Sequence, residues 1–86
     1  MSTLKGKVVL ITGASSGFGA AAAKRFAQEE CRVILAARRI ERLEQTANEV
    51  RAQGGEALPL SVDVSQPAQI DAMVKTAVDH YGRIDL

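Results

Sequence analysis

Three closely spaced glycines follow the first apolar run of the chain. Gly13, Gly17 and Gly19 come directly after Val8–Ile11 and Thr12. A buried strand that leads into a glycine-rich turn and then a helix is typical of phosphate binding in α/β proteins, because the first N–H groups of a helix lack intrahelical partners and carry the positive end of its dipole. A tight glycine turn without a ligand is the alternative interpretation. The loop residues that we predict to bind a phosphate-bearing ligand are Gly13, Ser15, Ser16, Gly17, Phe18 and Gly19.

A pair of arginines follows the second apolar run, Val33–Ala37. In a dinucleotide site specific for NAD, a carboxylate lies roughly 20 residues beyond the glycine motif and accepts hydrogen bonds from the ribose 2′-hydroxyl. Counting from Gly19 leads to Arg38 and Arg39, and no carboxylate lies there. Arginine can bind the 2′-phosphate of NADP through charge-assisted hydrogen bonds, whereas a carboxylate would repel it. The sequence therefore favours NADP(H) over NAD(H), with a solvated basic pair at a strand end as the alternative.

Apolar runs and amphipathic segments alternate along the chain and would position these residues. The runs Val8–Ile11, Val33–Ala37 and Leu58–Val62 are continuously apolar or nearly so, as in parallel strands covered on both faces. Segments with helical spacing of apolar residues follow the first two runs, at Gly17–Glu30 and Ile40–Gln53. With a third helix after the third run, the order β-α-β-α-β-α predicts an α/β fold with a Rossmann-type parallel sheet.

The third helix has a start and an end in the sequence. Ser65 is expected to cap its N-terminus with Pro67 in the first turn, and Gly82 is expected to end it. Its inner face is expected to comprise Ile70, Met73, Val74, Ala77 and Val78. Ile84–Leu86 resembles the start of a fourth strand, which in the strand order 3-2-1 would lie on the other side of the first strand. We therefore expect residues 1–86 to form one partial dinucleotide-binding domain, truncated at its fourth strand, with an open edge suited to self-association.

Composition and charge limit the classes of function. The chain has 86 residues, of which 47% are apolar and 24% charged, and a formal net charge of +1. This is the composition of a soluble globular domain, and it gives no reason to expect nucleic acid or an anionic membrane as a partner. The single cysteine, Cys31, permits no internal disulfide and is expected to be a small apolar residue at a strand edge. Without a signal peptide or an apolar stretch that could cross a bilayer, a cytoplasmic location is expected.

The glycine spacing resembles that of one particular family. The sequence T-G-A-S-S-G-F-G over residues 12–19 is similar to the T-G-x-x-x-G-x-G signature of the classical short-chain dehydrogenases/reductases. The resemblance covers essentially the whole chain, including Ala-Ala-Arg-Arg at the end of the second strand, Asp63-Val64 after the third, and Gly-Arg-Ile-Asp before the fourth. Phe18 departs from the Ile or Leu common at its position, a change that keeps the backbone N–H and enlarges only the side chain.

The resemblance implies roles for several residues. In NADP-preferring members, the residue at the position of Arg38 is the main partner of the 2′-phosphate, and Ser15 is a plausible second donor. Arg39 is a weaker candidate. The family's residue at the position of Asp63 hydrogen-bonds the adenine amino group, and the backbone of the next residue, here Val64, contacts the ring. The alternative for Asp63 is an acidic residue near a helix N-terminus, where the dipole favours it.

The catalytic residues that the resemblance implies are not found in these 86 residues. The family uses a Ser and a Tyr-x-x-x-Lys motif, in which the Tyr is the general acid/base and the Lys lowers its pKa while hydride passes between nicotinamide and a carbonyl carbon. Tyr81 is the only tyrosine and is followed at the Lys position by Asp85, so a packing role is expected. His80 has no partner at a useful spacing, and no residues form a metal-ligand pattern. No catalytic and no metal-binding residue is predicted.

Three hypotheses for the function remain. The first is the NADP(H)-binding portion of a short-chain oxidoreductase that interconverts a carbonyl and an alcohol, with a small-molecule carbonyl or alcohol as the substrate of the complete enzyme. The second is a non-catalytic dinucleotide-binding module. The third is a truncated fragment without a function of its own.

Overall fold

Three parallel strands form one sheet at the centre of the molecule. In the computed structural model, which describes residues 4–14 and 17–86, the strands are β1 (Val8–Thr12), β2 (Arg32–Ala37) and β3 (Glu56–Ser61). β2 lies between the other two, and the register pairs its Arg32 with Val8 of β1 and with Glu56 of β3. This confirms the parallel pairing and the strand order 3-2-1.

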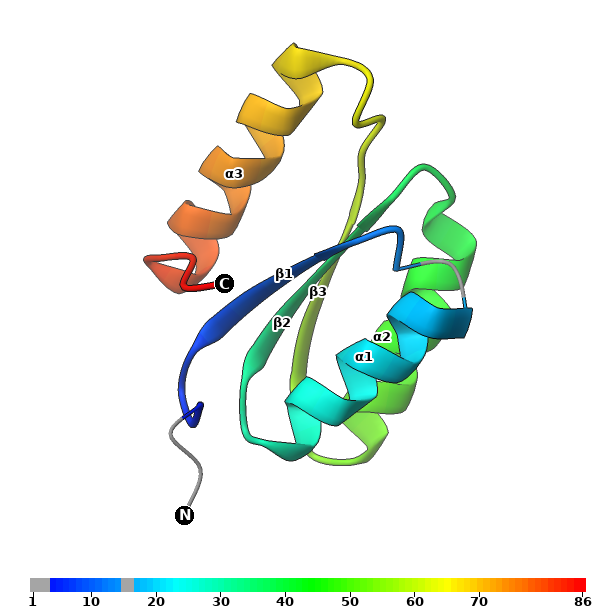
Figure 1. Ribbon diagram of the computed structural model, residues 1–86, viewed down its shortest axis with the longest axis vertical. Coiled ribbons are helices and arrows are strands. Elements are labelled where there is room, and N and C mark those ends of the chain that lie inside the picture. Colours follow the sequence, from blue (N-terminus) through cyan, green and yellow to red (C-terminus); the bar gives the residue numbers. More distant parts are fainter. Residues whose placement is uncertain (1–3, 15–16) are drawn as a thin grey trace.

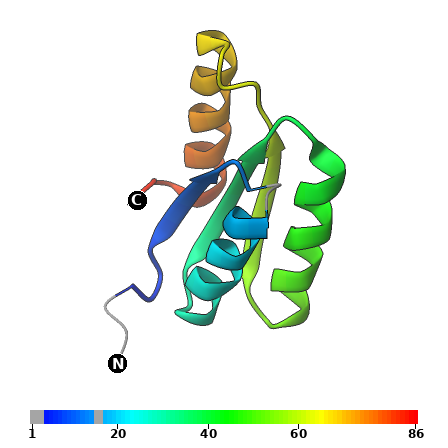
Figure 2. The ribbon, with the colours of Figure 1, turned by 45° about the vertical axis from the view of Figure 1, so that its right-hand side comes forward.

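Helices cover both faces of this sheet. They are α1 (Gly17–Gln28), α2 (Ile40–Ala52) and α3 (Pro67–Tyr81). α1 and α2 lie side by side on one face, and α3 lies on the opposite face (Figures 1 and 2). The order β-α-β-α-β-α and the helices on both faces confirm the Rossmann-type α/β fold.

The core explains why the second apolar run is continuous. Leu35 of β2 packs in a cluster with Ala23 of α1 and Leu43 of α2, whereas Ile34 packs with Ala77 of α3. Successive side chains of a strand point to opposite faces, so a strand buried on both faces needs an apolar residue at every position. All residues from 33 to 37 are accordingly buried.

The end of the chain returns to the outer side of β1. The Asp85 N–H donates to the Val8 carbonyl at 2.8 Å, and the Leu10 N–H donates to the Leu86 carbonyl at 2.9 Å. Residues 84–86 are not assigned as a strand, but they lie along the edge of β1 opposite β2, where the fourth strand is expected. In addition, Asp85 Oδ2 accepts a hydrogen bond from the Val8 N–H at 2.8 Å and lies 3.0 Å from Nε of Arg83.

Several element boundaries differ from those expected. α1 ends at Gln28 rather than Glu30, because Glu30 adopts a left-handed conformation with φ of 63° that a helix cannot continue. β3 begins at Glu56, two residues before the expected start, and ends at Ser61. Pro59 therefore lies within β3. Because the Val62 N–H donates to the Ala37 carbonyl, the strand alternation directs Pro59 to the outer edge, where no ladder hydrogen bond is lost.

The expectation that Ser65 caps α3 is wrong. The N-cap position is Gln66, which makes no side-chain cap, and Pro67 is the first residue of the helix. The Ser65 hydroxyl instead donates to Asp63 at 2.7 Å, because the loop turns back on that carboxylate before the helix begins. Gly82 does end the helix, as expected, with a φ of 85° and an N–H that donates to the Val78 carbonyl.

The inner face of α3 is narrower than expected. Met73 and Ala77 are buried and Ile70 packs against the core, but Val74 and Val78 are each 39% exposed. Residues 70, 73 and 77 lie along one line of the helix at spacings of three and four, whereas Val74 and Val78 each follow a residue of this line and are turned about 100° from that residue around the axis.

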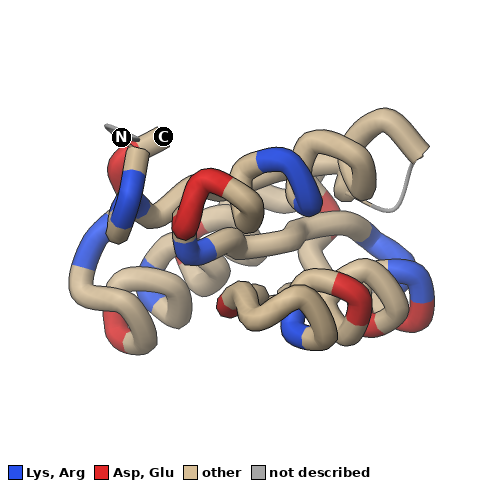
Figure 3. Tube along the Cα trace, turned by 90° about the horizontal axis from the view of Figure 1, so that it is seen from below, with Lys and Arg blue, Asp and Glu red and all other residues tan. Residues whose placement is uncertain are grey.

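Surface charges are mixed, and no helix of the described part of the chain is long and apolar enough to cross a membrane. Basic and acidic residues are interspersed over the molecule and do not gather on one side (Figure 3). Cys31 is buried, and its thiol donates a hydrogen bond to the Leu4 carbonyl oxygen at 3.4 Å. Burial raises the pKa of this thiol. Cys31 is thus the small buried residue that the sequence predicted.

The contact between Asp85 and β1 is expected to depend on pH. The hydrogen bond from Val8, assisted by the charges of Arg83 and Lys7, holds the pKa of Asp85 below its usual value. A carboxyl group whose pKa is lower in the folded state stabilises the fold when ionised, and this contribution is lost as the pH falls. The Asp85→Ala change should therefore lower the free energy of unfolding at neutral pH, and the difference should shrink below about pH 4.

Urea unfolding of both proteins at neutral pH and at about pH 3 measures this dependence. Glu44→Ala, which removes an exposed carboxylate from the middle of α2, is the matched control and should show no such pH-dependent difference. An equal loss of stability by Asp85→Ala at both pH values would contradict the role of the ionised carboxylate.

Candidate dinucleotide-binding site

The carboxyl ends of the three strands meet at one edge of the sheet, which is where open α/β sheets bind ligands. A cavity of about 320 Å³ at this edge is lined by Gly13, Ala37, Arg38, Arg39, Val62 and Val64. These residues come from the end of β2 and from the segments that follow the three strands, so the fold brings together positions that are far apart in the sequence. Of the predicted loop residues, Ser15 and Ser16 lie outside the described residues.

Each glycine of the motif meets a different physical requirement. Gly13 has a φ of +66°, a conformation that side-chain-bearing residues rarely adopt. A Cβ on Gly19 would lie 2.6 Å from the Gly13 carbonyl oxygen and 2.8 Å from Cα of Ala14, so α1 can approach the loop only without a side chain there. A Cβ on Gly17 would meet no atom within 4 Å. Gly17 therefore leaves open space at the start of α1, where a phosphate could approach the helix N-terminus.

Phe18 lies on another side of the loop from the arginines. Its side chain is 89% exposed, and it lines a separate depression together with Gly13, Gly19, β1 and Leu86. Gly13 borders both depressions. The structure thus places the Phe18 side chain toward the outer edge of β1, whereas Arg38 and Arg39 lie toward β3.

The two arginines leave the sheet where β2 ends. The Arg38 side chain is 78% exposed, and its backbone carbonyl accepts a hydrogen bond from the Ser61 hydroxyl at 3.0 Å. Arg39 occupies the N-cap position of α2 in an extended conformation and makes no side-chain cap. The backbone of Arg38 is thus tied to β3 while its guanidinium group reaches into solvent, where it is accessible to an anion.

Asp63 lies beside Arg38 and is held in a defined orientation. Its Oδ1 accepts hydrogen bonds from the Ser65 hydroxyl at 2.7 Å and the Ser65 N–H at 3.0 Å, and its Oδ2 lies 4.0 Å from Nε of Arg38. The Asp63 N–H donates to Oε1 of Gln69 in the first turn of α3 at 2.8 Å. The bonds from Ser65, and more weakly the charge of Arg38, hold the pKa of Asp63 below its usual value, so the carboxylate is ionised at neutral pH.

Sequence reasoning missed Ser65 and Gln69 as partners of Asp63. The signal that could have revealed Ser65 is the Asp-x-Ser spacing, because an Asp side chain often accepts a hydrogen bond from the backbone two residues later. The alternative interpretation of Asp63 as a partner of the helix dipole is less direct in this geometry, since both hydrogen bonds to Oδ1 come from Ser65, ahead of the helix.

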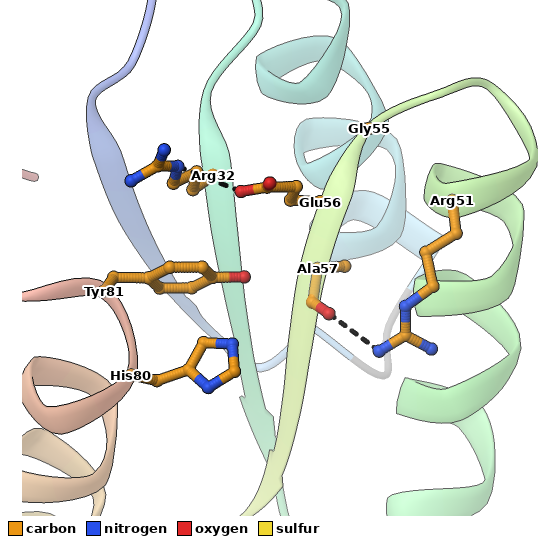
Figure 4. Close-up of a pocket in the computed structure, with 7 residues that line it drawn as sticks. All are labelled: Arg32, Arg51, Gly55, Glu56, Ala57, His80 and Tyr81. Carbon is orange, nitrogen blue, oxygen red and sulfur yellow. Dashed lines mark hydrogen bonds and ion pairs between the residues drawn. The ribbon is translucent and has the colours of Figure 1, made fainter.

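A polar depression at the opposite end of the sheet contains His80 and Tyr81 (Figure 4). Arg32 pairs with Glu56 at 2.9 Å and lies 5.9 Å from the centre of the Tyr81 ring, and Nη2 of Arg51 donates to the Ala57 carbonyl at 2.8 Å.

Burial raises the pKa of Tyr81, which packs against the cluster of Val8, Ile34 and Ala77. Tyr81 thus has the packing role expected for it. Among the described residues, no group of three or more His, Cys, Asp or Glu could hold a metal ion.

Comparisons with known proteins agree with this architecture. Residues 7–86 match the model of the short chain dehydrogenase family. The ketoacyl reductase HetN of Nostoc sp. is 43% identical over 86 residues, which is all of this chain and 30% of that protein. The crystal structure of a metagenomic short-chain oxidoreductase in complex with NADP superimposes with a TM-score of 0.92 and 39% identity, over 99% of this chain and 38% of that one. A short chain dehydrogenase/reductase from Burkholderia phymatum in complex with NAD gives a TM-score of 0.91 and 37% identity, over 98% of this chain and 30% of that one.

These relatives are longer proteins, and the chain spans about a third of the length of the curated relatives it matches. The two solved neighbours hold different dinucleotides, one NADP and the other NAD. The family match extends over nearly the whole chain, from before β1 to its last residue. With its glycine motif, strand order and carboxyl-edge cavity, the chain therefore belongs to the short-chain dehydrogenase family of oxidoreductases.

Proposed function

We propose that this chain binds NADP(H) in preference to NAD(H) and forms the dinucleotide-binding part of an oxidoreductase that interconverts a carbonyl and an alcohol. The observation that carries the proposal is the cavity in which Gly13, Arg38 and Arg39 lie together at the carboxyl edge of the sheet. Structures of family members with bound NADP support it.

The residues fit a dinucleotide with a 2′-phosphate. The open space at Gly17 would admit the pyrophosphate to the N-terminus of α1, and the exposed guanidinium group of Arg38 would bind the 2′-phosphate. Asp63 and the backbone of Val64 would contact the adenine ring, because Asp63 is an ionised acceptor and Val64 lines the same cavity. Ser15, Ser16 and Arg39 remain predicted contacts of the phosphates.

The reaction itself is proposed from the family. The bound cofactor supplies hydride chemistry at its nicotinamide ring. The residues of this chain would bind and orient its adenosine, 2′-phosphate and pyrophosphate groups, and none of them is proposed as a proton donor. In a complete enzyme, the catalytic Ser and the Tyr-x-x-x-Lys motif would come from residues outside these 86.

A non-catalytic dinucleotide-binding module is the second candidate, because the cavity at the carboxyl edge accounts for binding of a dinucleotide and not for turnover. The two candidates differ in a simple assay. NADPH oxidation in the presence of aldehydes and ketones by the protein in its native length supports the enzyme, and dinucleotide binding without turnover supports the module. The intact mass of the native protein shows directly how much chain accompanies these residues.

Reversing the charge at position 38 tests the cofactor preference. Arg38→Asp removes the proposed partner of the 2′-phosphate and places a carboxylate where it could accept hydrogen bonds from a 2′-hydroxyl. We expect the ratio of the NADP⁺ and NAD⁺ dissociation constants to shift toward NAD⁺ by roughly 10- to 100-fold, the worth of one or two hydrogen bonds to a charged group.

Isothermal titration calorimetry with both cofactors measures this ratio. Arg42→Asp makes the same change of charge on an exposed position of α2 outside the cavity and is the matched control. A ratio that is unchanged in Arg38→Asp, or changed equally in both variants, would refute the role of Arg38.

Two alanine substitutions separate the folding and binding roles of the glycines. Gly19→Ala should lower both stability and affinity, because its Cβ would collide with the backbone of Gly13 and Ala14. Gly17→Ala should leave the unfolding transition nearly unchanged, because its Cβ meets open space, but should weaken NADP⁺ binding by about tenfold or more if the pyrophosphate lies there. Thermal unfolding and calorimetric titration of both variants provide the measurements. Full affinity in Gly17→Ala would exclude this loop as the pyrophosphate site.

A further inference from the structure

The two carboxylate oxygens of Asp63 have different surroundings. Oδ1 accepts two hydrogen bonds from one residue, the hydroxyl and the N–H of Ser65. Among residues 4–14 and 17–86, the contact found for Oδ2 is a longer one, at 4.0 Å from Nε of Arg38. The Asp63 side chain remains 29% exposed, so a ligand in the neighbouring cavity could reach Oδ2. Of the two oxygens, Oδ2 is therefore the one with capacity to accept a hydrogen bond from a ligand.

Asp63 is also fixed through its backbone. Its N–H donates to Oε1 of Gln69, which links the residue to the first turn of α3. The main chain of Asp63 is thus held from the helix and its side chain from Ser65. With both ends held, the direction of Oδ2 is set by the protein rather than chosen on ligand binding, which lowers the entropy cost of a specific contact.

The contact with Ser65 is not explained by the needs of the helix or of the core. Ser65 is exposed, and the N-cap position of α3 is Gln66. If the Ser65 hydroxyl were absent, Asp63 would lose the shorter of the two bonds on Oδ1, and Oδ2 would no longer be held in one direction. A hydrogen bond from a ligand to Oδ2 would then have to order the carboxylate, which costs conformational entropy.

We propose that Ser65 is a positioning residue that holds Oδ1 of Asp63, so that Oδ2 selects a base with an exocyclic amino group over one with a carbonyl at the same position. The proposal rests on the dinucleotide-binding function proposed above and deepens it by naming a determinant of base specificity. An ionised carboxylate accepts a hydrogen bond from the amino group of adenine, whereas the carbonyl oxygen of hypoxanthine offers no donor and repels it. The low pKa of Asp63 supports this selection, because only the ionised group discriminates in this way.

The test compares NADP⁺ with its deamino analogue, in which hypoxanthine replaces adenine. Dissociation constants for both ligands are measured by calorimetry on the native-length protein and on Ser65→Ala, Ser65→Thr and Gln66→Ala. The parent protein should bind NADP⁺ about tenfold or more tightly than the analogue, as expected for a hydrogen bond to a charged group. Ser65→Ala should reduce this preference to about threefold or less, mainly by weakening NADP⁺ binding. Ser65→Thr keeps the hydroxyl and should retain the preference, as should Gln66→Ala, which alters an exposed side chain of the same loop that makes no cap.

A second measurement needs no ligand. The pKa of the Asp63 carboxyl group, followed by NMR in the free protein, should rise toward its ordinary value in Ser65→Ala, because the Ser65 hydroxyl is the largest contributor to its lowered pKa. Gln66→Ala should leave it unchanged.

Each other outcome is decisive. An unchanged preference in Ser65→Ala, or an equal loss of affinity for both ligands, would overturn the positioning role. If the parent protein binds both ligands equally, this inference fails while the dinucleotide-binding function stands. If it binds neither ligand, both proposals fail together.

Discussion

The burial of β2 on both faces is the constraint on which the rest of the structure depends. β2 pairs with β1 on one side and β3 on the other, and its side chains pack alternately against α1 and α2 or against α3. A strand in this position admits no charged residue between Val33 and Ala37, so its arginines lie outside that run. Arg32 emerges at one end of the sheet, and Arg38 and Arg39 emerge at the other. The requirement to keep the core apolar thus also places the basic pair at the carboxyl edge.

Much of the fold could be predicted because its signals are local. Continuous apolar runs indicate strands covered on both faces, and the glycine turn shows where β1 gives way to α1. The differences arise where tertiary contacts decide. Glu30 adopts a left-handed conformation after α1 although it is not a glycine, so the sequence gives no signal for this helix end. The exposure of Val74 and Val78 depends on how α3 packs against the sheet, which the spacing of apolar residues does not determine.

The candidate site was predictable to a similar degree. The spacing of Gly13, Gly17 and Gly19 indicated a phosphate-binding loop, but only the structure shows that one glycine meets a backbone requirement, one a packing requirement and one leaves open space. Asp63 was identified from a family resemblance, whereas its partners Ser65 and Gln69 were not. The path of the loop before α3 decides whether the Ser65 hydroxyl caps the helix or bonds to Asp63, and the sequence does not reveal this path. The family could be recognised from the sequence motif, whereas the preference for NADP(H) over NAD(H) is a proposal that rests on the charge of Arg38.

The two outer edges of the sheet differ in the hydrogen-bonding groups that they offer to a further strand. An outward-facing carbonyl, that of Ala57, is already hydrogen-bonded to Arg51, and Pro59 offers no donor to a passing strand. On the opposite edge, β1 already forms ladder hydrogen bonds with Asp85 and Leu86. A further strand would therefore find few free hydrogen-bonding groups at the outer edge of β3, whereas residues 85 and 86 already pair with the outer edge of β1. β3 is therefore the edge strand of this sheet, whereas β1 is flanked by β2 on one side and by residues 85 and 86 on the other.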